Sequence, residues 1–350
     1  LLAKTSVIVF IGLILSKLLG YSYRIIIARY YGPEVYGLFT LALTVVMFFG
    51  AIVSLGLTEG LLRYIPLLRA KRKFDEIRYL IHKTLRLYFI LGIITSVAMI
   101  ALSDIISVGI FHNIALSSLI KIIGTITVFS LAMNVFITSI RAFEEIGWYS
   151  FVYNIFQNVV RVLLLTILIV IGIKSGGIAV GLSFALGAIL TFLMSYWICR
   201  NKIKVIFGKY KQKDYSSLRK AFFSYSWPVV FYSLVSLIFY WIDTFSLGYY
   251  KSAVEVGLYN AAVPIAMLLG FVPELFMQLF YPMINKEYSR KNYGLIEQLS
   301  KQVTKWIFVV ILPIFVLLFL FPGAAINILF GSQYLPAENA LRLLLIGTFI

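Results

Sequence analysis

The sequence predicts an all-α, polytopic membrane protein. Its two pseudo-symmetric lobes are parallel repeats of six transmembrane helices around a central cleft, and the second lobe is truncated. Three observations predict this fold class: the composition, a series of apolar segments long enough to cross a membrane, and a partial internal repeat. Hydrophobic residues make up 61% of the 350 residues, charged residues only 13%, and the mean hydropathy is +0.95. Because a soluble domain carries roughly a quarter charged residues, this composition excludes a soluble fold.

Ten segments are apolar over about the 20 residues that a helix needs to cross the hydrocarbon core. With this assignment, one side of the membrane carries 23 Lys and Arg residues, and the other carries only Arg29, Lys174 and Lys251. Basic loops stay in the cytoplasm, so we expect a multi-pass protein of the cell membrane with a cytoplasmic N-terminus. The predicted helices are 6–28, 36–62, 85–107, 116–140, 149–172, 177–199, 222–247, 255–284, 304–322 and 337 onward.

The formal net charge of +17 does not indicate a nucleic-acid-binding protein here, because the basic residues lie in short loops between spans. We expect anionic membrane lipids to be the partners of most of them, and no nucleic acid. The first cytoplasmic loop, residues 69–86, has Phe74, Ile77, Leu80 and Ile81 at helical spacing. This pattern predicts an amphipathic helix on the inner leaflet, with a solvated connector as the alternative.

The segment Arg200–Lys220 carries eight Lys and Arg residues against the single acid Asp214. It is predicted to be the cytoplasmic loop between the lobes, with Ser216 as a candidate N-cap of the next helix. The expected division is an N-terminal six-helix lobe at 1–200, a basic inter-lobe loop at 201–221 and a C-terminal lobe at 222–350. From Pro336 to Ile350 a helix reaches only about 22 Å, short of the ~30 Å core, so we expect a fragment of a longer chain.

The chain beyond this loop partly repeats the chain before it. The turn Tyr31–Phe39, YGPEVYGLF, has a counterpart in Ala253–Tyr259, AVEVGLY, about 220 residues later. Six spans separate equivalent points, and six is even, so both halves enter the membrane in the same direction. The repeat is therefore parallel, and two such lobes facing each other would enclose the cleft.

These motifs, followed by Leu329–Tyr334 (LFGSQY) and by Ala337 and Leu341–Leu343 (LRL), resemble the polysaccharide-export branch of the multidrug/oligosaccharidyl-lipid/polysaccharide (MOP) exporter superfamily. That branch includes the O-antigen repeat-unit flippases. The resemblance covers essentially all 350 residues and depends on the order and spacing of short motifs. It implies twelve or fourteen spans in two lobes, alternating access and translocation of a lipid-linked sugar. It also implies two to four further spans beyond this sequence.

Several charged and polar residues lie inside predicted spans, where each cation costs roughly 2.5 to 3.5 kcal/mol on insertion scales. Such charges must face water or partners, so we predict a cationic substrate-binding cleft. Lys121 also has the alternative of extending to the outer headgroups, and Lys17 and Arg24 that of a static ion pair. The candidate residues are Lys17, Arg24, Lys121 and Arg161, together with Asn154, Gln157 and Asn158, which form a polar stripe at helical spacing with Arg161.

Asp243 and Glu274 are the deep acids, and each is a candidate for either an ion-coupling site or a counter-ion. Coupling would involve H+ or Na+. His82, His112 and Cys199 are not clustered with other ligands, so no metal site, catalytic residue or cofactor is predicted. Gly177, Gly181 and Ala185 form a small-residue ladder that predicts close helix packing.

The leading hypothesis is therefore a monomeric flippase, not an enzyme, that moves a polyprenyl-(pyro)phosphate-linked oligosaccharide across the cytoplasmic membrane for cell-surface polysaccharide biosynthesis. Fixed cations would replace the water lost by the anionic pyrophosphate. A peptidoglycan-precursor flippase and a cation-coupled multidrug exporter of the same superfamily remain alternatives. A membrane glycosyltransferase or polymerase is the alternative of a different class, although the acids of the outer loops are not clustered. A non-transporting scaffold would have no use for buried charge.

Overall fold

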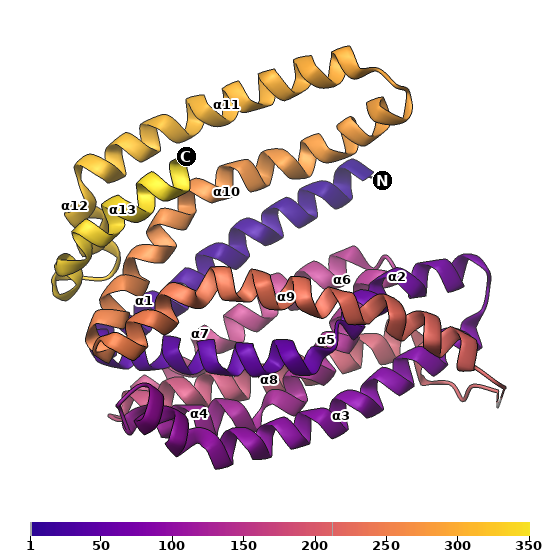
Figure 1. Ribbon diagram of the computed structural model, residues 1–350, viewed down its shortest axis with the longest axis horizontal. Helices are drawn as coiled ribbons and strands as arrows, with labels where there is room; N and C mark the ends of the chain where they lie inside the picture. The colour runs from indigo at the N-terminus through magenta and orange to yellow at the C-terminus, as the bar shows by residue number, and fades with distance from the viewer. Residues whose placement is uncertain (1, 212) are drawn as a thin grey trace. The chain divides into compact units, whose positions relative to one another are not determined.

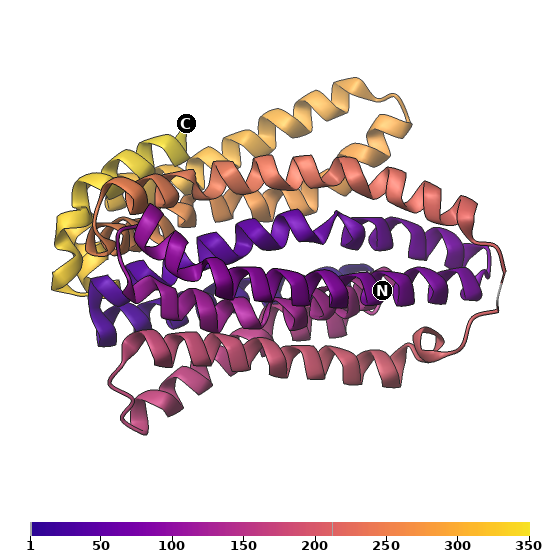
Figure 2. The same ribbon diagram turned by 60° about the horizontal axis from the view of Figure 1, so that its bottom comes forward.

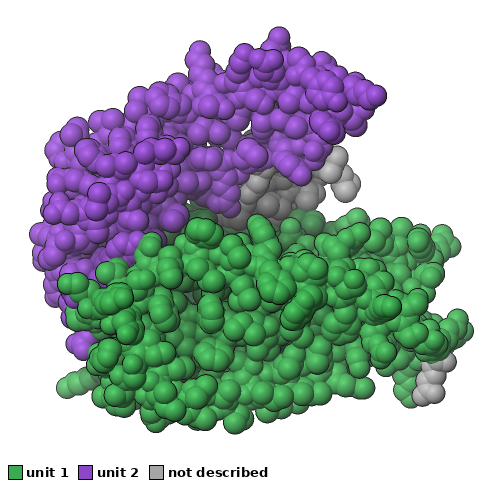
Figure 3. Space-filling view, in the orientation of Figure 1, with its two compact units in different colours: residues 1–27, 38–253 green, residues 28–37, 254–350 purple. Residues whose placement is uncertain are grey.

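The computed structural model describes residues 2–211 and 213–350, which are helical with short connections and, over these ranges, contain no strand (Figure 1). The chain divides into two compact units, coloured separately in Figure 3. Unit 1 comprises Leu1–Ile27 and Leu38–Ala253, and unit 2 comprises Ala28–Gly37 and Val254–Ile350. The short segment Ala28–Gly37 therefore belongs to unit 2, although the chain on both sides of it belongs to unit 1.

The first helical element, α1, runs from Leu2 to Ser54 with a break at Gly32. At φ 83° and ψ 179°, Gly32 has a conformation that only glycine adopts readily, and Pro33 follows it. The apolar part of α1, Ile14–Ser54, has 41 residues. It would be about 62 Å long as one helix, twice the thickness of the hydrocarbon core. The break therefore separates the two predicted spans.

The second of these spans ends at Ser54, eight residues before the predicted end. Leu55 and Gly56 both have positive φ, and α2 begins at Leu57 and continues to Ala70. The remaining elements of unit 1 are α3 (Phe74–Asp104), η1 (Ile105–Ile110), α4 (Ala115–Thr125), α5 (Thr127–Ala142), α6 (Ile146–Ser150), η2 (Phe151–Phe156), α7 (Gln157–Val170), α8 (Gly176–Lys202), η3 (Lys204–Phe207) and α9 (Ser216–Tyr250).

Within unit 1, α3 packs against α4 and α5, and α8 packs against α4, α5 and α7. These helices run lengthwise through the unit in both views (Figures 1 and 2). The prediction that Ser216 is the N-cap of α9 is wrong, because Ser216 is already the first helical residue. The carboxylate of Asp214 instead accepts hydrogen bonds from the backbone N–H and the hydroxyl of Ser216, at 2.8 and 2.9 Å.

Unit 2 is built around two long helices. Its elements are α10 (Ala253–Ser289), α11 (Tyr293–Leu320), α12 (Pro322–Leu329), η4 (Ser332–Ala337) and α13 (Glu338–Phe349). α13 packs against α11, α12 and η4. α10 runs continuously through Pro264, Gly270 and Pro273.

Seven helices among the described residues are long and apolar enough to cross a membrane, or eight when the bent pair α4 and α5 is taken as one span. The bend between these two helices is 43°. Since the segment Ile14–Ser54 contains two spans joined at Gly32, nine of the ten predicted spans have a counterpart. The tenth corresponds to α13, which has 12 residues and is too short to cross.

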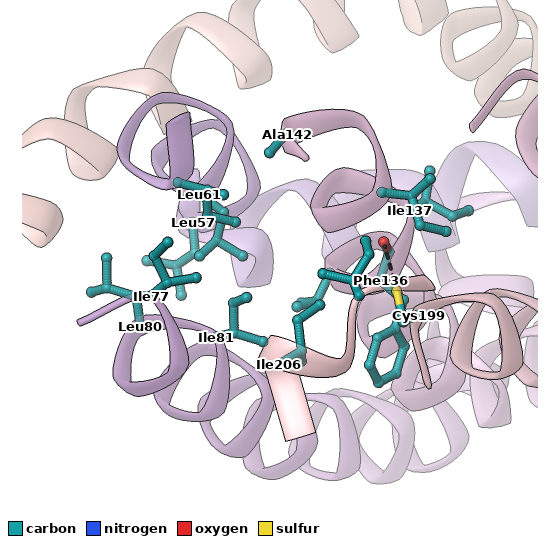
Figure 4. Packing of buried hydrophobic residues seen from close by; sticks show 14 of the residues in the cluster. Leu57, Leu61, Ile77, Leu80, Ile81, Phe136, Ile137, Ala142, Cys199 and Ile206 are labelled. Carbon is teal, nitrogen blue, oxygen red and sulfur yellow. Dashed lines mark hydrogen bonds between the residues drawn. The ribbon is translucent and has the colours of Figure 1, made fainter. Parts of the chain in front are cut away.

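A cluster of buried apolar side chains joins α2, α3, α5, α8, η3 and α9 within unit 1, and Figure 4 shows part of it. Ile77, Leu80 and Ile81 of α3 are fully or almost fully buried in it. The prediction of an amphipathic helix on the inner leaflet is therefore wrong. A turn at residues 71–72 interrupts the 69–86 segment, and its apolar face packs inside the protein instead of on lipid.

Cys199 lies in the same cluster, where its Sγ is 3.5 Å from the carbonyl oxygen of Phe136 (Figure 4). Arg78 fastens the following segment to α3, because its guanidinium donates to the carbonyl oxygens of Val205 (2.7 Å) and Lys209 (3.4 Å). The basic inter-lobe loop is thus attached to unit 1. The two units are defined by packing in the structure, whereas the predicted lobes at 1–200 and 222–350 are defined by the internal repeat in the sequence. These lobe boundaries stay a prediction.

Candidate functional site

Arg161 lies on α7 of unit 1, within the candidate span Ile146–Val170. Its guanidinium stacks on the ring of Phe184 of α8, with the central carbon 4.0 Å from the ring centroid. Its Nε is buried and has no hydrogen-bond partner among the described residues. No carboxylate in the described part of the chain forms an ion pair with it. A cation in this position is stabilised by an aromatic face instead of a counter-charge.

The ring of Phe184 is itself held by aromatic contacts within unit 1. Phe39 meets it edge-on at 5.8 Å between centroids, and Tyr23 meets Phe39 in the same way at 5.9 Å. The Tyr23 hydroxyl lies 2.9 Å from the Ser183 hydroxyl and donates to the carbonyl oxygen of Val180 at 3.3 Å. These residues were not predicted from the sequence, because aromatic residues on apolar helices give no signal that separates a site from ordinary packing.

The polar stripe on η2 and α7 faces small residues of α1. Asn158 donates to the hydroxyl of Ser16 at 3.2 Å and to the carbonyl oxygen of Asn154 at 3.0 Å. A Cβ added at Gly12 would lie 3.4 Å from the amide nitrogen of Asn154, and one added at Gly20 would lie 3.9 Å from the amide oxygen of Asn158.

Two of the three stripe residues are thereby engaged in helix packing. Asn154 is only 4% exposed and donates to the hydroxyl of Ser150 at 3.2 Å, whereas Gln157 is half-buried. Gly12, Ser16 and Gly20 are spaced four residues apart, which is the pattern that lets two membrane helices approach closely.

The other predicted cations have different environments. Lys17 is exposed and Arg24 is half-buried, both on α1. Lys121 of α4 donates to both carboxylate oxygens of Asp104 at the end of α3, at 2.9 and 3.1 Å. The Ser117 hydroxyl also donates to Asp104. The structure thus gives Lys121 a local counter-charge.

The two predicted acids belong to different units: Asp243 lies on α9 of unit 1, and Glu274 lies on α10 of unit 2. Both are exposed. Among the described residues, no group of three or more His, Cys, Asp or Glu side chains could hold a metal ion. The predicted packing role of the small-residue ladder is confirmed, because Gly177 and Gly181 of α8 approach Leu119 of α4 closely.

The motifs that carry the resemblance meet in unit 2. Arg29 donates from Nε to the carbonyl oxygen of Leu329 at 2.9 Å, and from Nη2 to the carbonyl oxygens of Asn327 (3.4 Å) and Ile328. These are the last carbonyls of α12, where the helix supplies few N–H partners; the Asn327 carbonyl also accepts from the backbone N–H of Gly331, at 3.0 Å. Arg29 therefore satisfies them with a cation at the negative end of the helix.

Two buried tyrosines complete this contact. Burial raises the pKa of Tyr334, so its hydroxyl stays protonated and donates to the carbonyl oxygen of Ala28 at 3.2 Å. Tyr36 donates to the carbonyl oxygen of Asn260 at 3.1 Å, and its ring lies 6.5 Å from that of Tyr334. Gly257 of α10 packs directly on the backbone of the turn. The parts of the three motifs that belong to unit 2, residues 31–37, 254–259 and 329–334, thus form one packed cluster.

The model of the polysaccharide biosynthesis protein family matches residues 1–272. The chain belongs to the polysaccharide biosynthesis protein family. None of the curated proteins matches this member of the family in sequence.

Several solved structures share its fold. An inward-facing multidrug resistance MATE family transporter of the MOP superfamily is 17% identical, with a TM-score of 0.78 over 98% of this chain and 81% of that chain. The MATE multidrug transporter DinF-BH is 18% identical, with a TM-score of 0.69 over 93% and 74%. A MOP superfamily transporter from Pyrococcus furiosus is 16% identical, with a TM-score of 0.65 over 99% and 79%.

These matches confirm the predicted resemblance and the predicted fold class. This polysaccharide biosynthesis protein is a multi-pass, all-α membrane protein with the fold of the MATE transporters. Its family is that of the polysaccharide biosynthesis proteins, and the MATE multidrug transporters share its fold. At 16–19% identity the structural matches describe the fold, and the substrate is a separate question.

Proposed function

We propose that this protein is a flippase that moves a polyprenyl-(pyro)phosphate-linked oligosaccharide across the cytoplasmic membrane by alternating access. The observation that carries the proposal is Arg161, a guanidinium inside a membrane span that has an aromatic face and no carboxylate partner among the described residues. Keeping Arg at mid-span costs roughly 2.5 to 3.5 kcal/mol on insertion scales, so such residues generally serve a pathway or a ligand. The phosphate of a lipid-linked sugar is an anion that a guanidinium binds through paired hydrogen bonds.

Lys17 and Arg24 are proposed to extend the cationic path along α1, with Gln157 contributing a polar contact. Asn154 and Asn158 would act through the packing of α1 on α7, and Lys121 would attract headgroups at the Asp104 end of unit 1. Asn154, Asn158 and Lys121 already have a packing or pairing role, whereas the Nε of Arg161 has no hydrogen-bond partner among the described residues.

Asp243 and Glu274 are proposed as sites or counter-ions for a coupling ion, H+ or Na+. A cytoplasmic N-terminus would place the exposed Lys and Arg of the 200–220 loop against anionic lipids of the inner leaflet. We propose that the protein acts as a monomer, with the lobe division at 1–200, 201–221 and 222–350.

A multidrug exporter is the second candidate, because the matched structures include MATE multidrug transporters. The charge of the candidate site argues against a cationic drug, since Arg161 would repel it. A peptidoglycan-precursor flippase would require the same cationic site and is a variant of the first proposal. For the Pyrococcus furiosus transporter, reverse polarity of the binding pocket suggests a different function, so pocket charge is a meaningful criterion on this fold.

The test is a translocation assay in proteoliposomes with a fluorescent polyprenyl pyrophosphate oligosaccharide. The measurement is the fraction of the probe that remains protected from an impermeant quencher. Arg161→Gln should lower the rate by about 10- to 150-fold, which corresponds to a charged hydrogen bond of about 1.5–3 kcal/mol. Lys174→Gln removes an exposed loop cation and is the matched control.

The thermal midpoint and the size-exclusion profile of both variants establish that they are folded. A folded Arg161→Gln protein that moves the probe at the wild-type rate would overturn the proposal. Equal transport of a cationic dye by both proteins, with no transport of the pyrophosphate probe, would favour the multidrug exporter.

A further inference from the structure

Two residues of α8 accommodate the side chain of Arg161: the ring of Phe184 contacts its guanidinium, and Gly187 leaves space beside its aliphatic part. The ring of Phe184 lies under the guanidinium at 4.0 Å, and Gly187, three residues later on the same helix face, leaves space for the side-chain stem. A Cβ added at Gly187 would lie 2.7 Å from Cγ of Arg161, which is closer than nonbonded carbons approach. The position of the guanidinium is therefore determined by α8 as well as by α7.

With its central carbon 4.0 Å from the ring centroid, the guanidinium is limited by Phe184 in the directions in which it can offer hydrogen bonds. All five N–H bonds of Arg lie in the guanidinium plane, so a ring against its face leaves every donor directed sideways. Nε already lacks an acceptor among the described residues. A phosphate bound side-on to Nε and one Nη group would supply this acceptor in the bidentate geometry that guanidinium favours.

The ring is held in turn by contacts that do not depend on a ligand. Phe39 meets it edge-on, Tyr23 meets Phe39, and the hydrogen bond between Tyr23 and Ser183 closes the set. A guanidinium on a fixed ring loses little further freedom when an anion binds, and this preorganisation favours affinity.

We propose that Phe184 is a positioning residue for transport, which orients the guanidinium of Arg161 toward the phosphate of the lipid-linked substrate, and that Gly187 is the spacer this geometry requires. The inference depends on the proposed function, because it assigns Phe184 a role through Arg161. The competing explanation is that Phe184 only fills space between helices.

The experiment compares four single variants in the same proteoliposome assay with the fluorescent polyprenyl pyrophosphate probe. Phe184→Leu keeps an apolar side chain and removes the ring, whereas Phe184→Tyr keeps the ring. A cation–π contact accounts for about 2- to 30-fold in an equilibrium, so Phe184→Leu should slow translocation by that factor and Phe184→Tyr by less than about twofold. Phe192→Leu is the matched control on α8, because Phe192 packs against Phe129 and Phe136 and not against a cation. Gly187→Ala should slow transport in the same range as Phe184→Leu.

A fifth protein, the Arg161→Gln and Phe184→Leu double variant, separates positioning from packing. If Phe184 acts through Arg161, adding Phe184→Leu to Arg161→Gln should cause no further loss. An additive further loss would show that Phe184 acts as packing alone, and would overturn the inference. So would a Phe184→Leu rate equal to wild type while Arg161→Gln is slow.

Wild-type transport by Arg161→Gln would instead overturn the proposed function itself, which makes the two failures distinguishable. If Phe184→Leu does not fold, Gly187→Ala provides the same comparison with and without Arg161→Gln. A loss from Gly187→Ala that persists in the Arg161→Gln background would then overturn the inference.

Discussion

Gly257 offers a direct test of how the family motifs pack in unit 2. A Cβ added there would lie 2.8 Å from the carbonyl carbon of Pro33 and 3.1 Å from the backbone nitrogen of Gly37, and closer still to the Pro33 oxygen. These are backbone atoms, which cannot rotate away as a side chain would. Ala in a helix is favoured over Gly by about 0.8–1.0 kcal/mol, but overpacking of a fixed backbone costs up to about 3 kcal/mol. Gly257→Ala should therefore lower the free energy of unfolding by about 2 kcal/mol.

Gly270→Ala on the same helix is the matched control, because no atom of the described residues lies within 4 Å of the added Cβ. The helix-propensity gain should then act alone and raise stability by about 0.5–1 kcal/mol. The assay is equilibrium unfolding in mixed detergent and SDS micelles, with helix content followed by circular dichroism. If both variants are stabilised to a similar extent, α10 does not contact the turn at Gly257, and the packing described for the motifs is wrong.

Three further outcomes follow from other parts of the structure. Because Cys199 is buried, an impermeant maleimide should label native protein much more slowly than SDS-denatured protein, and equal rates would contradict the burial. Arg78→Ala should expose residues 204–209 to proteolysis, because the carbonyl oxygens of Val205 and Lys209 lose their hydrogen-bond donor. Each lost hydrogen bond should cost about 1–3 kcal/mol. Unchanged resistance to proteolysis would contradict the role of Arg78 in holding this segment. Hydrogen bonds from the backbone N–H of Ser216, and then from its hydroxyl, lower the pKa of Asp214 in the folded protein. The ionised Asp214 therefore contributes its full stabilisation of the folded state above its unfolded-state pKa of about 4. This stabilisation is lost as the pH falls through the lowered folded-state pKa. The rate of hydrogen exchange of the Ser216 amide, divided by its intrinsic rate, should rise in the wild type over the pH range in which Asp214 becomes protonated. The Asp214→Asn variant should show no rise over that range.

The spans were predictable from the sequence, because the free energy of placing a helix in the hydrocarbon core depends mainly on the residues of that helix. The break at Gly32 was also predictable, from the Gly-Pro pair. The error at Ile77, Leu80 and Ile81 has a different cause. An apolar stripe at helical spacing is the same whether lipid or protein covers it, and only the packing of α2, α5 and η3 determines which.

The charged residues of the candidate site could be predicted from the sequence, but the residues that contact them could not. The energetic cost of a cation inside a span pointed to Lys17, Arg24, Lys121 and Arg161 alike from the sequence alone. Phe184 could not be singled out, since it is one of 29 phenylalanines and lies on a helix of mostly apolar residues. The partner of the polar stripe had a readable signal, because Gly12, Ser16 and Gly20 show the four-residue spacing of close helix contacts.

The evidence for the family and the evidence for the substrate come mostly from different residues, with Phe39 common to both. Most of the motif residues lie in unit 2, where Tyr36, Gly257 and Tyr334, together with Arg29, satisfy helix ends and pack the turn at 28–37. Any transporter that keeps this turn needs these contacts, whatever it carries. The charge that motivates an anionic substrate lies in unit 1, on Arg161 and its ring. Substitutions of the motif residues in unit 2 should therefore change stability, and only substitutions around Arg161 can distinguish a lipid-linked sugar from a cationic drug.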